Sequence, residues 1–245
     1  MQVYVNQVTG IADAITTMFM SKRTWTRDLE RNIRETVEAV TDENGIFLPQ
    51  EEHYNIPEGY YKDYNDWMDK LTKWTKTHIT LGRFIDFSVT VEGLHRAGQD
   101  DWDAHAHRFE NRIIRSSTRM AKFTYEMSNY YQDKIISTDE ALAMEHIETP
   151  NEIVVDGVKY VKVVNGYVRE DLKYNNDVLR GLYMLSIPSN FIFKINLTQW
   201  AHVYKERNKN GHANPEVKEC CEAIADQLQK FQPWFTRELF EEIRN

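Results

Sequence analysis

FIDFSVTVE, at residues 84–92, carries the clearest strand pattern in the chain. Its apolar side chains alternate with polar ones, and they are Ile85, Phe87, Val89 and Val91. Successive side chains of a strand point to opposite faces, so this alternation places all four on one face. The stretch therefore predicts a sheet strand with one apolar face.

Helical patterns are expected on both sides of this strand. The first 40 residues read as helical, because apolar side chains recur every four residues at Trp25, Leu29, Ile33 and Val37. Further helices are predicted over about 60–77, 94–130, 172–186, 197–209 and 215–231, with a short terminal helix after Pro233 and Trp234. FIFKIN, at residues 191–196, is short and apolar, so it fits either a strand or a buried helix.

A β-hairpin is predicted at EIVVDGVKYVKVVNG, residues 152–166, where Asp156-Gly157 suits a two-residue turn. The order of elements is then helices, strand, helices, hairpin and helices, which favours an α+β fold over repeated βαβ units. No linker rich in Pro, Gly or Ser interrupts the chain. We expect one domain over residues 1–245, with residues 150–168 as a hairpin insertion.

Composition and charge exclude several classes of protein. The chain has 245 residues, enough for a large core, and its net charge of −8 argues against a broad nucleic-acid-binding surface, although a local basic pocket stays possible. Neither a membrane span nor a signal peptide is recognisable, so we expect a cytoplasmic protein without a membrane partner. The only cysteines, Cys220 and Cys221, are adjacent and are expected to pack inside a helix rather than form a disulfide.

The densest polar stretch is DDWDAHAHRFENRIIRSSTR, residues 100–119. Arginines, hydroxyls and histidines together suit a phosphate site, while a solvated helix with paired charges is the competing interpretation. Asp103, His107 and Glu110 would share one helical face, but one face rarely completes a metal site and no HExxH motif occurs, so we predict no metal. The chain also lacks GxSxG, Walker and GxGxxG motifs.

Several blocks of the chain, taken together, resemble the flavin-dependent thymidylate synthases, the ThyX family. The blocks are His78-x-Thr80 before the strand, HRFENRIIRSSTRMAKFTYE (107–126), LRGLYML (179–185) and the tail that begins with NLTQWAH at residue 196. Such a resemblance implies a ThyX-like fold, in which helices pack around a small, mostly antiparallel sheet.

The chain also departs from the family pattern. Ser117-x-Arg119 matches the end of the family's Arg-His-Arg signature, but the first arginine of that signature is absent. Three other positions differ in residue type: Arg115 stands near the family's usual glutamate, Thr198 at its usual arginine and His202 at its usual asparagine. The hairpin at 150–168 is foreign to the family, which tends to have helix there.

The resemblance implies roles for individual residues. The residues that it implies for nucleotide binding are Ser117, Arg119, Arg180 and Arg207, of which Ser117 and Arg119 would bind the phosphate. Arg207 would lie near the pyrimidine base and act as the catalytic electrostatic partner of its carbonyl. The FAD site would be lined by Ser21, Thr80, His107, Arg108, Asn196, His202 and His212.

The implied activity is reductive methylation of dUMP to dTMP, with FAD as cofactor and with methylenetetrahydrofolate and NADPH as co-substrates. The resemblance also implies a homotetramer with shared flavin sites. Two alternatives stay open because the Arg-His-Arg region is altered. One is a related flavoenzyme that modifies C5 of another pyrimidine nucleotide, for example by hydroxymethylation. The other is a non-catalytic protein that binds a nucleotide or a partner.

Overall fold

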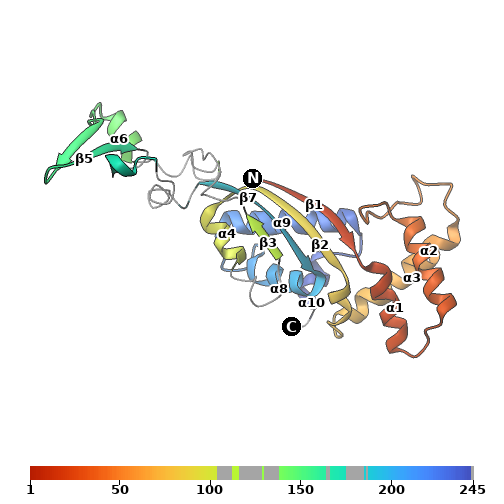
Figure 1. Cartoon of the computed structure of the whole chain (residues 1–245). Helices are drawn as coiled ribbons and strands as arrows, with labels where there is room; N and C mark the ends of the chain where they lie inside the picture. Colours follow the sequence, from red (N-terminus) through yellow and green to blue (C-terminus); the bar gives the residue numbers. More distant parts are fainter. Residues whose placement is uncertain are drawn as a thin grey trace.

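A four-stranded antiparallel sheet forms the centre of the computed structural model, which describes residues 1–103, 112–115, 129, 138–163, 166–174, 185 and 187–243 (Figure 1). Its strands, in spatial order, are β1 (Gln2–Thr9), β2 (Asp86–His95), β7 (Pro188–Asn196) and β3 (Arg112–Arg115). Each neighbouring pair is antiparallel. The predicted α+β class with an antiparallel sheet is therefore confirmed.

Helices cover one face of this sheet and extend from one of its ends (Figure 1). The helices that pack over that face are α4 (Arg96–Asp103), α8 (Leu197–Arg207), α9 (Pro215–Phe231) and α10 (Arg237–Glu242). The group at the end consists of α1 (Ile11–Ser21), α2 (Arg27–Val40), α3 (Glu58–Thr75) and the 3-10 helix η1 (Leu81–Phe84). No helix among the described residues is long and apolar enough to span a bilayer.

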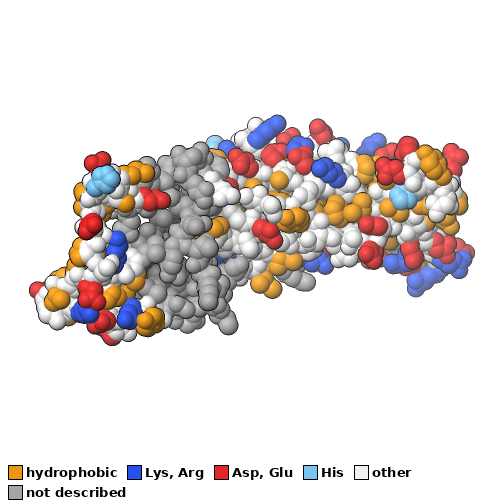
Figure 2. Space-filling view, turned by 90° about the horizontal axis from the view of Figure 1, so that it is seen from above, with side chains coloured by type: hydrophobic (Ala, Val, Ile, Leu, Met, Phe, Trp, Pro, Cys, Tyr) orange, Lys and Arg blue, Asp and Glu red, His pale blue; other side chains and the backbone are white. Residues whose placement is uncertain are grey.

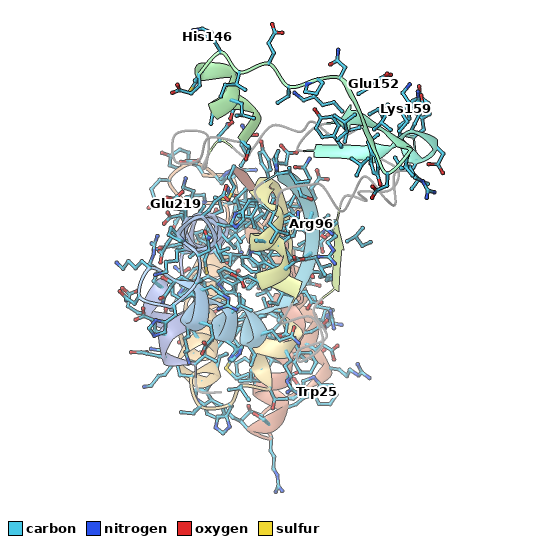
Figure 3. The ribbon with its side chains drawn as sticks, turned by 90° about the vertical axis from the view of Figure 1, so that its left-hand side faces the viewer. Trp25, Arg96, His146, Glu152, Lys159 and Glu219 are labelled. Carbon is cyan, nitrogen blue, oxygen red and sulfur yellow. The ribbon has the colours of Figure 1, made fainter. Side chains whose placement is uncertain are left out.

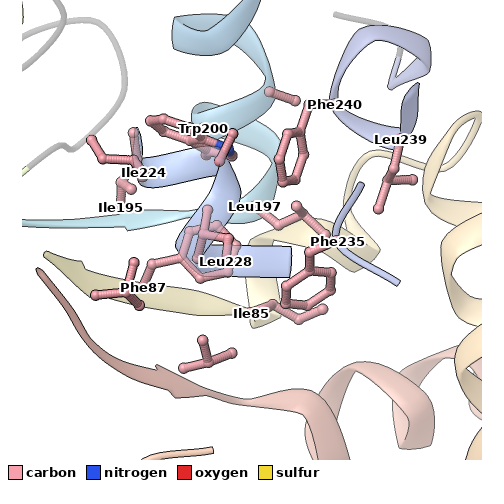
Figure 4. Packing of buried hydrophobic residues seen from close by; sticks show 14 of the residues in the cluster. Ile85, Phe87, Ile195, Leu197, Trp200, Ile224, Leu228, Phe235, Leu239 and Phe240 are labelled. Carbon is pink, nitrogen blue, oxygen red and sulfur yellow. The ribbon is translucent and has the colours of Figure 1, made fainter. Parts of the chain in front are cut away.

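The core lies between the sheet and these helices. Phe87, Val89 and Val91 of β2 are fully buried, which confirms the predicted strand and its apolar face. FIFKIN is also a strand, since it forms the end of β7 and pairs its Phe193 directly with Val89. Figure 4 shows Trp200 of α8, with other apolar side chains of α8 to α10, closing over this face.

The expectation of helix throughout the first 40 residues is wrong for residues 2–9, which form β1. Val3, Val5 and Val8 are buried there, but a bulge between Val5 and Gln7 breaks the alternation that would have indicated a strand. Helices do follow, as α1 and α2. Gly10 joins β1 to α1 with a positive φ of 84°.

The expected long helix over 94–130 is wrong at residues 112–115. Helix α4 ends at Asp103, and residues 112–115 form β3 at the edge of the sheet, with Ile113 opposite Phe193. Two consecutive β-branched isoleucines favour a strand once an edge is available to pair with. The rest of this prediction, at 104–111, 116–128 and 130, lies outside the described residues.

A second, three-stranded sheet contains the predicted hairpin and one strand that was not predicted. Its strands are β4 (Glu152–Val155), β5 (Val158–Val163) and β6 (Gly166–Arg169), flanked by α6 (Thr138–Met144) and the 3-10 helix η2 (Glu170–Leu172). The turn is confirmed, because Asp156 and Gly157 both have the positive φ of a type I′ turn. Figure 3 shows this sheet, labelled at Glu152 and Lys159, standing apart from the larger one.

Later helices agree with the sequence. The predictions at 60–77, 197–209, 215–231 and after Trp234 correspond to α3, α8, α9 and α10. Most of the predicted 172–186 helix lies outside the described residues. Cys220 and Cys221 are buried in α9, as expected, and burial raises the pKa of both thiols. The single domain over 1–245 stays a prediction.

Gly10→Ala should destabilise the protein strongly. A Cβ at Gly10 would lie 1.7 Å from the carbonyl oxygen of Phe84, and its φ of +84° is unfavourable for alanine. We expect the free energy of unfolding, measured by urea titration, to fall by about 1–3 kcal/mol. Gly59→Ala is the matched control, because nothing lies within 4 Å of its Cβ position, and it should be neutral or stabilising by up to about 1 kcal/mol. Equal effects of the two substitutions would contradict this role of Gly10.

Candidate functional site

The start of α8 is held against the segment that precedes β2. Asn196 caps α8, because its side-chain oxygen accepts a hydrogen bond from the Gln199 backbone N–H at 2.9 Å. The Thr198 hydroxyl donates to the carbonyl oxygen of Ile79 at 2.6 Å, and the Leu197 N–H donates to that of Ile85 at 2.9 Å. These bonds bring Thr80 close to Asn196, although 116 positions of sequence separate them.

Gly82 makes this close approach possible. A Cβ at Gly82 would lie 2.5 Å from the Thr198 hydroxyl oxygen, so only glycine fits between η1 and α8. The cap engages the Oδ1 atom of Asn196, and its Nδ2 donates no hydrogen bond to another described residue. Thr80 is exposed. The junction therefore presents an amide donor and a hydroxyl to a ligand.

Ser21 is the last residue of α1, whose first turn packs against Phe84 of η1. Its hydroxyl donates to the carbonyl oxygen of Met18 at 2.8 Å. The next residue, Lys22, places its Nζ 3.6 Å from the ring centre of Trp74, and this ring lies 5.3 Å from that of His78. The structure thus brings Thr80 and Asn196, both predicted for the flavin site, to one junction, and it places Lys22, the neighbour of Ser21, against Trp74 of the preceding helix α3.

Arg207, predicted to act on the base, is the last residue of α8. Its Nε is buried and has no hydrogen-bond partner in the part of the chain that the structure describes. A buried donor without a partner is costly, and it is normally satisfied by water or a ligand. The guanidinium also acts on Cys221, because its charge opposes the increase that burial causes in the thiol pKa. Arg207 is therefore suited to an anionic or carbonyl ligand.

The predicted site residues on or near α8 are spread along the whole helix. This helix has 11 residues, so Asn196 and Arg207 lie about 16 Å apart along it. His202 is half-buried along α8, and His212 is exposed in the loop before α9. A mononucleotide cannot reach both ends. A dinucleotide can, or the ends can belong to sites that two copies complete.

Five predicted site residues cannot be placed. His107, Arg108, Ser117, Arg119 and Arg180 lie outside the described residues. Arg115, noted as a departure from the family, is on β3 and forms an ion pair with Asp100 at 2.8 Å. Among the described residues, no three His, Cys, Asp or Glu side chains gather as a metal site would require.

Sequence reasoning missed a buried pair at the start of α9, the helix that follows the loop with His212. His95 ends β2 and Glu216 lies in the first turn of α9, and each side chain is only 2% exposed. The imidazole Nδ1 contacts the Glu216 carboxylate, which also accepts the His95 backbone N–H at 3.3 Å. No local pattern could reveal it, because the two residues are 121 positions apart. The contact between Lys22 and Trp74 was also missed, because these two residues are far apart in the sequence.

Comparisons with known proteins concern the family and the fold of the chain. The family described as thymidylate synthase complementing protein matches residues 26–234. No curated protein matches the chain. Two of the similar solved structures are flavin-dependent thymidylate synthases ThyX from Helicobacter pylori with FAD and dUMP, each 12% identical. Their TM-scores are 0.54 and 0.55, with coverage of 100% of both chains for the first and of 98% and 99% for the second.

A third structure is a UMP/dUMP methylase, PolB, from Streptomyces cacaoi bound with 5-Br dUMP. It is 9% identical with a TM-score of 0.55, over 98% of this chain and 93% of that one. At such identities these likenesses concern the fold alone. The family match is different, because it extends over most of the sequence. The chain belongs to the thymidylate synthase complementing protein family, the flavin-dependent thymidylate synthases.

Proposed function

We propose that this chain is a flavin-dependent thymidylate synthase that converts dUMP to dTMP, with methylenetetrahydrofolate as one-carbon donor and NADPH as reductant. The observation that carries the proposal is the buried Nε of Arg207 at the end of α8, which has no hydrogen-bond partner among the described residues, in a chain of this family. A pyrimidine carbonyl would satisfy that donor. Arg207 would then stabilise the negative charge that develops on the oxygen during reaction at C5.

FAD fits the residues at the other end of α8. The exposed hydroxyl of Thr80 and the uncommitted Nδ2 of Asn196 are donors of the kind that ribityl and phosphate oxygens require, and the Ser21 hydroxyl, which donates to Met18, can still accept a hydrogen bond. The ThyX structures from Helicobacter pylori, which share the fold, contain FAD and dUMP. Bound FAD supplies the hydride chemistry. We extend the flavin site to His107, Arg108, His202 and His212, and the nucleotide site to Ser117, Arg119 and Arg180.

No cysteine nucleophile is needed in this proposal. Cys220 and Cys221, the only cysteines, are fully buried, and burial raises the pKa of each thiol. Neither can supply a thiolate to attack C6 of the pyrimidine. Activation of dUMP then rests on orientation of the base and on the charge of Arg207.

A homotetramer belongs to the same proposal. The flavin residues near Asn196 and the base residue Arg207 lie at opposite ends of α8, about 16 Å apart. A second copy that brings its Arg207 end to the Asn196 end would bring both sets around one flavin and one dUMP. We propose that the sites are shared in this way, in the cytoplasm.

A second candidate is modification of C5 in another pyrimidine nucleotide, including hydroxymethylation. Arg115, near the usual position of a family glutamate, pairs with Asp100 at 2.8 Å, so this neighbourhood carries a cation and its counter-ion. The similar fold of a UMP/dUMP methylase is compatible with such a variant. The nucleotide that the protein accepts as substrate decides between this candidate and thymidylate synthesis.

The reaction itself distinguishes these candidates. Purified protein with FAD, NADPH and methylenetetrahydrofolate should convert dUMP to dTMP, identified by the product mass after chromatography. The same incubation with UMP and dCMP is the control. A modified product from UMP or dCMP but none from dUMP would favour the second candidate. Absence of turnover with every nucleotide, despite a folded protein, would favour the non-catalytic alternative.

Arg207→Gln should lower kcat by about 10²–10³-fold, the loss expected when one oxyanion-stabilising donor is removed. Arg207→Lys keeps the positive charge but loses the planar donor, so we expect only partial rescue. Lys209→Gln, an exposed cation two residues further on, should change kcat less than about twofold. Steady-state kinetics with dUMP measures all three. An unchanged kcat in Arg207→Gln would remove this arginine from the mechanism.

A further inference from the structure

A single carboxylate holds the chain on both sides of Arg207. Glu222 lies on α9, and its Oε1 accepts a hydrogen bond from the Lys209 backbone N–H at 3.1 Å. The two oxygens of the same carboxylate lie 3.4 and 3.5 Å from the Tyr204 hydroxyl, which donates to them. Tyr204 precedes Arg207 by three residues and Lys209 follows it by two. Glu222 therefore ties the end of α8 to α9 around this arginine.

Arg237 of α10 fixes the orientation of this carboxylate. Its Nε donates to Glu222 at 2.8 Å, and one of its terminal nitrogens donates to Asp226 at 2.5 Å. The hydrogen bond to Glu222 is the main cause of the raised pKa of Arg237. A charge-assisted bond from a planar guanidinium restricts the rotation of the carboxylate that accepts it.

Many ion pairs of this protein join exposed side chains only. Figure 2 shows acidic and basic side chains gathered at the end of the molecule that α1 to α3 form, and Arg31 and Asp28 there are 69% and 86% exposed. Exposed pairs of this kind restrain the structure little. Glu222 differs, because it is only 21% exposed and accepts a backbone N–H in addition to the guanidinium of Arg237.

Glu222 lies near Arg207 and yet leaves the buried donor of that arginine uncommitted. Burial raises the pKa of the Cys221 thiol, the charge of Glu222 raises it further, and the charge of Arg207 opposes both. Both charges are therefore close to one thiol. The carboxylate is engaged by Arg237, and the Nε of Arg207 has no hydrogen-bond partner among the described residues. That donor stays available to a ligand.

We propose that Glu222, oriented by Arg237, is a positioning residue that holds Arg207 against its ligand. Arg207 is the last residue of α8, and the ends of helices fray unless other contacts hold them. The bonds of Glu222 on either side of Arg207 limit that movement. A displacement of about 1 Å at a catalytic group can lower the rate by about 10²-fold. The inference rests on the proposed function for the ligand of Arg207, a pyrimidine carbonyl.

Glu222→Ala should lower kcat with dUMP by about 10–100-fold and change KM by less than about threefold, because the positioned donor acts mainly in the transition state. Glu222→Gln keeps an oxygen that can accept the Lys209 N–H, so it should retain more of the rate than Glu222→Ala. Asp226→Asn is the matched control. Among the described residues Asp226 bonds to Arg237 alone, so this variant should change kcat by less than about twofold.

A double variant separates positioning from a general structural role. If Glu222 acts through Arg207, Glu222→Ala should change kcat by less than about twofold in a protein that already carries Arg207→Gln. An equal loss in the wild type and in the Arg207→Gln protein would overturn the inference, because Glu222 would then support only the fold. Should Glu222→Ala not fold, Arg237→Gln takes its place in both comparisons, since it frees the carboxylate to rotate.

The Arg207 donor can also be observed without turnover. In protein made with ¹⁵N-labelled arginine, its Nε–H signal is the one that Arg207→Gln removes. This hydrogen should exchange with deuterium oxide at least about 10-fold faster in Glu222→Ala than in the wild type, and at an unchanged rate in Asp226→Asn. Faster exchange in a protein that turns over no nucleotide would contradict the proposed function and support the positioning role. Unchanged exchange in a protein that makes dTMP would overturn this inference and leave the proposed function untouched.

Discussion

The pairing of β2 with β7 determines where the other parts of the molecule lie. Phe87, Val89 and Val91 share one buried face with Phe191, Phe193 and Ile195 of β7, so a slip of β7 by one residue would turn its apolar row toward solvent. The register that avoids this places Asp86 opposite Asn196, the last residue of β7 and the cap of α8. The start of α8 is thereby fixed beside residues 79–85. The register of β2 against β7 therefore both buries the apolar side chains and positions the candidate flavin site.

The sequence predicts those elements whose own pattern is complete. β2 shows uninterrupted alternation, and α9 has Pro215 in its first turn, so both were found. β1 was missed because its bulge interrupts the alternation, and β3 because four residues at a sheet edge become a strand only through their partner β7. Pairing across the chain is tertiary information that no local window contains.

The same distinction applies to the candidate site. Resemblance to the family supplied Thr80 and Asn196 as residue types, but their proximity depends on Gly82 and on the Thr198 bond to Ile79. Neither contact has a local signature. The buried His95–Glu216 pair also joins distant segments, the end of β2 and the first turn of α9, and so fixes the loop that carries His212. The residue types in the sequence indicate which ligands the site could bind, but only the folded structure shows which of these residues lie together.

Charge is distributed in agreement with a nucleotide-binding role. The chain is acidic overall, and many of its surface cations are neutralised by near neighbours, as on α2 and in the three-stranded sheet at Lys159. The candidate site contains an exception, because the buried Nε of Arg207 has no hydrogen-bond partner among the described residues. A buried donor without a partner is unfavourable by itself. Binding of an anionic ligand would remove that cost.

The visible absorbance spectrum of the purified protein, recorded before and after addition of NADPH and dUMP, tests the central claim most directly. A flavin site built from Ser21, Thr80 and Asn196 predicts the band of an oxidised flavin, present on isolation or after addition of FAD, which bleaches when NADPH is added. A colourless protein that takes up no added FAD would contradict the claim.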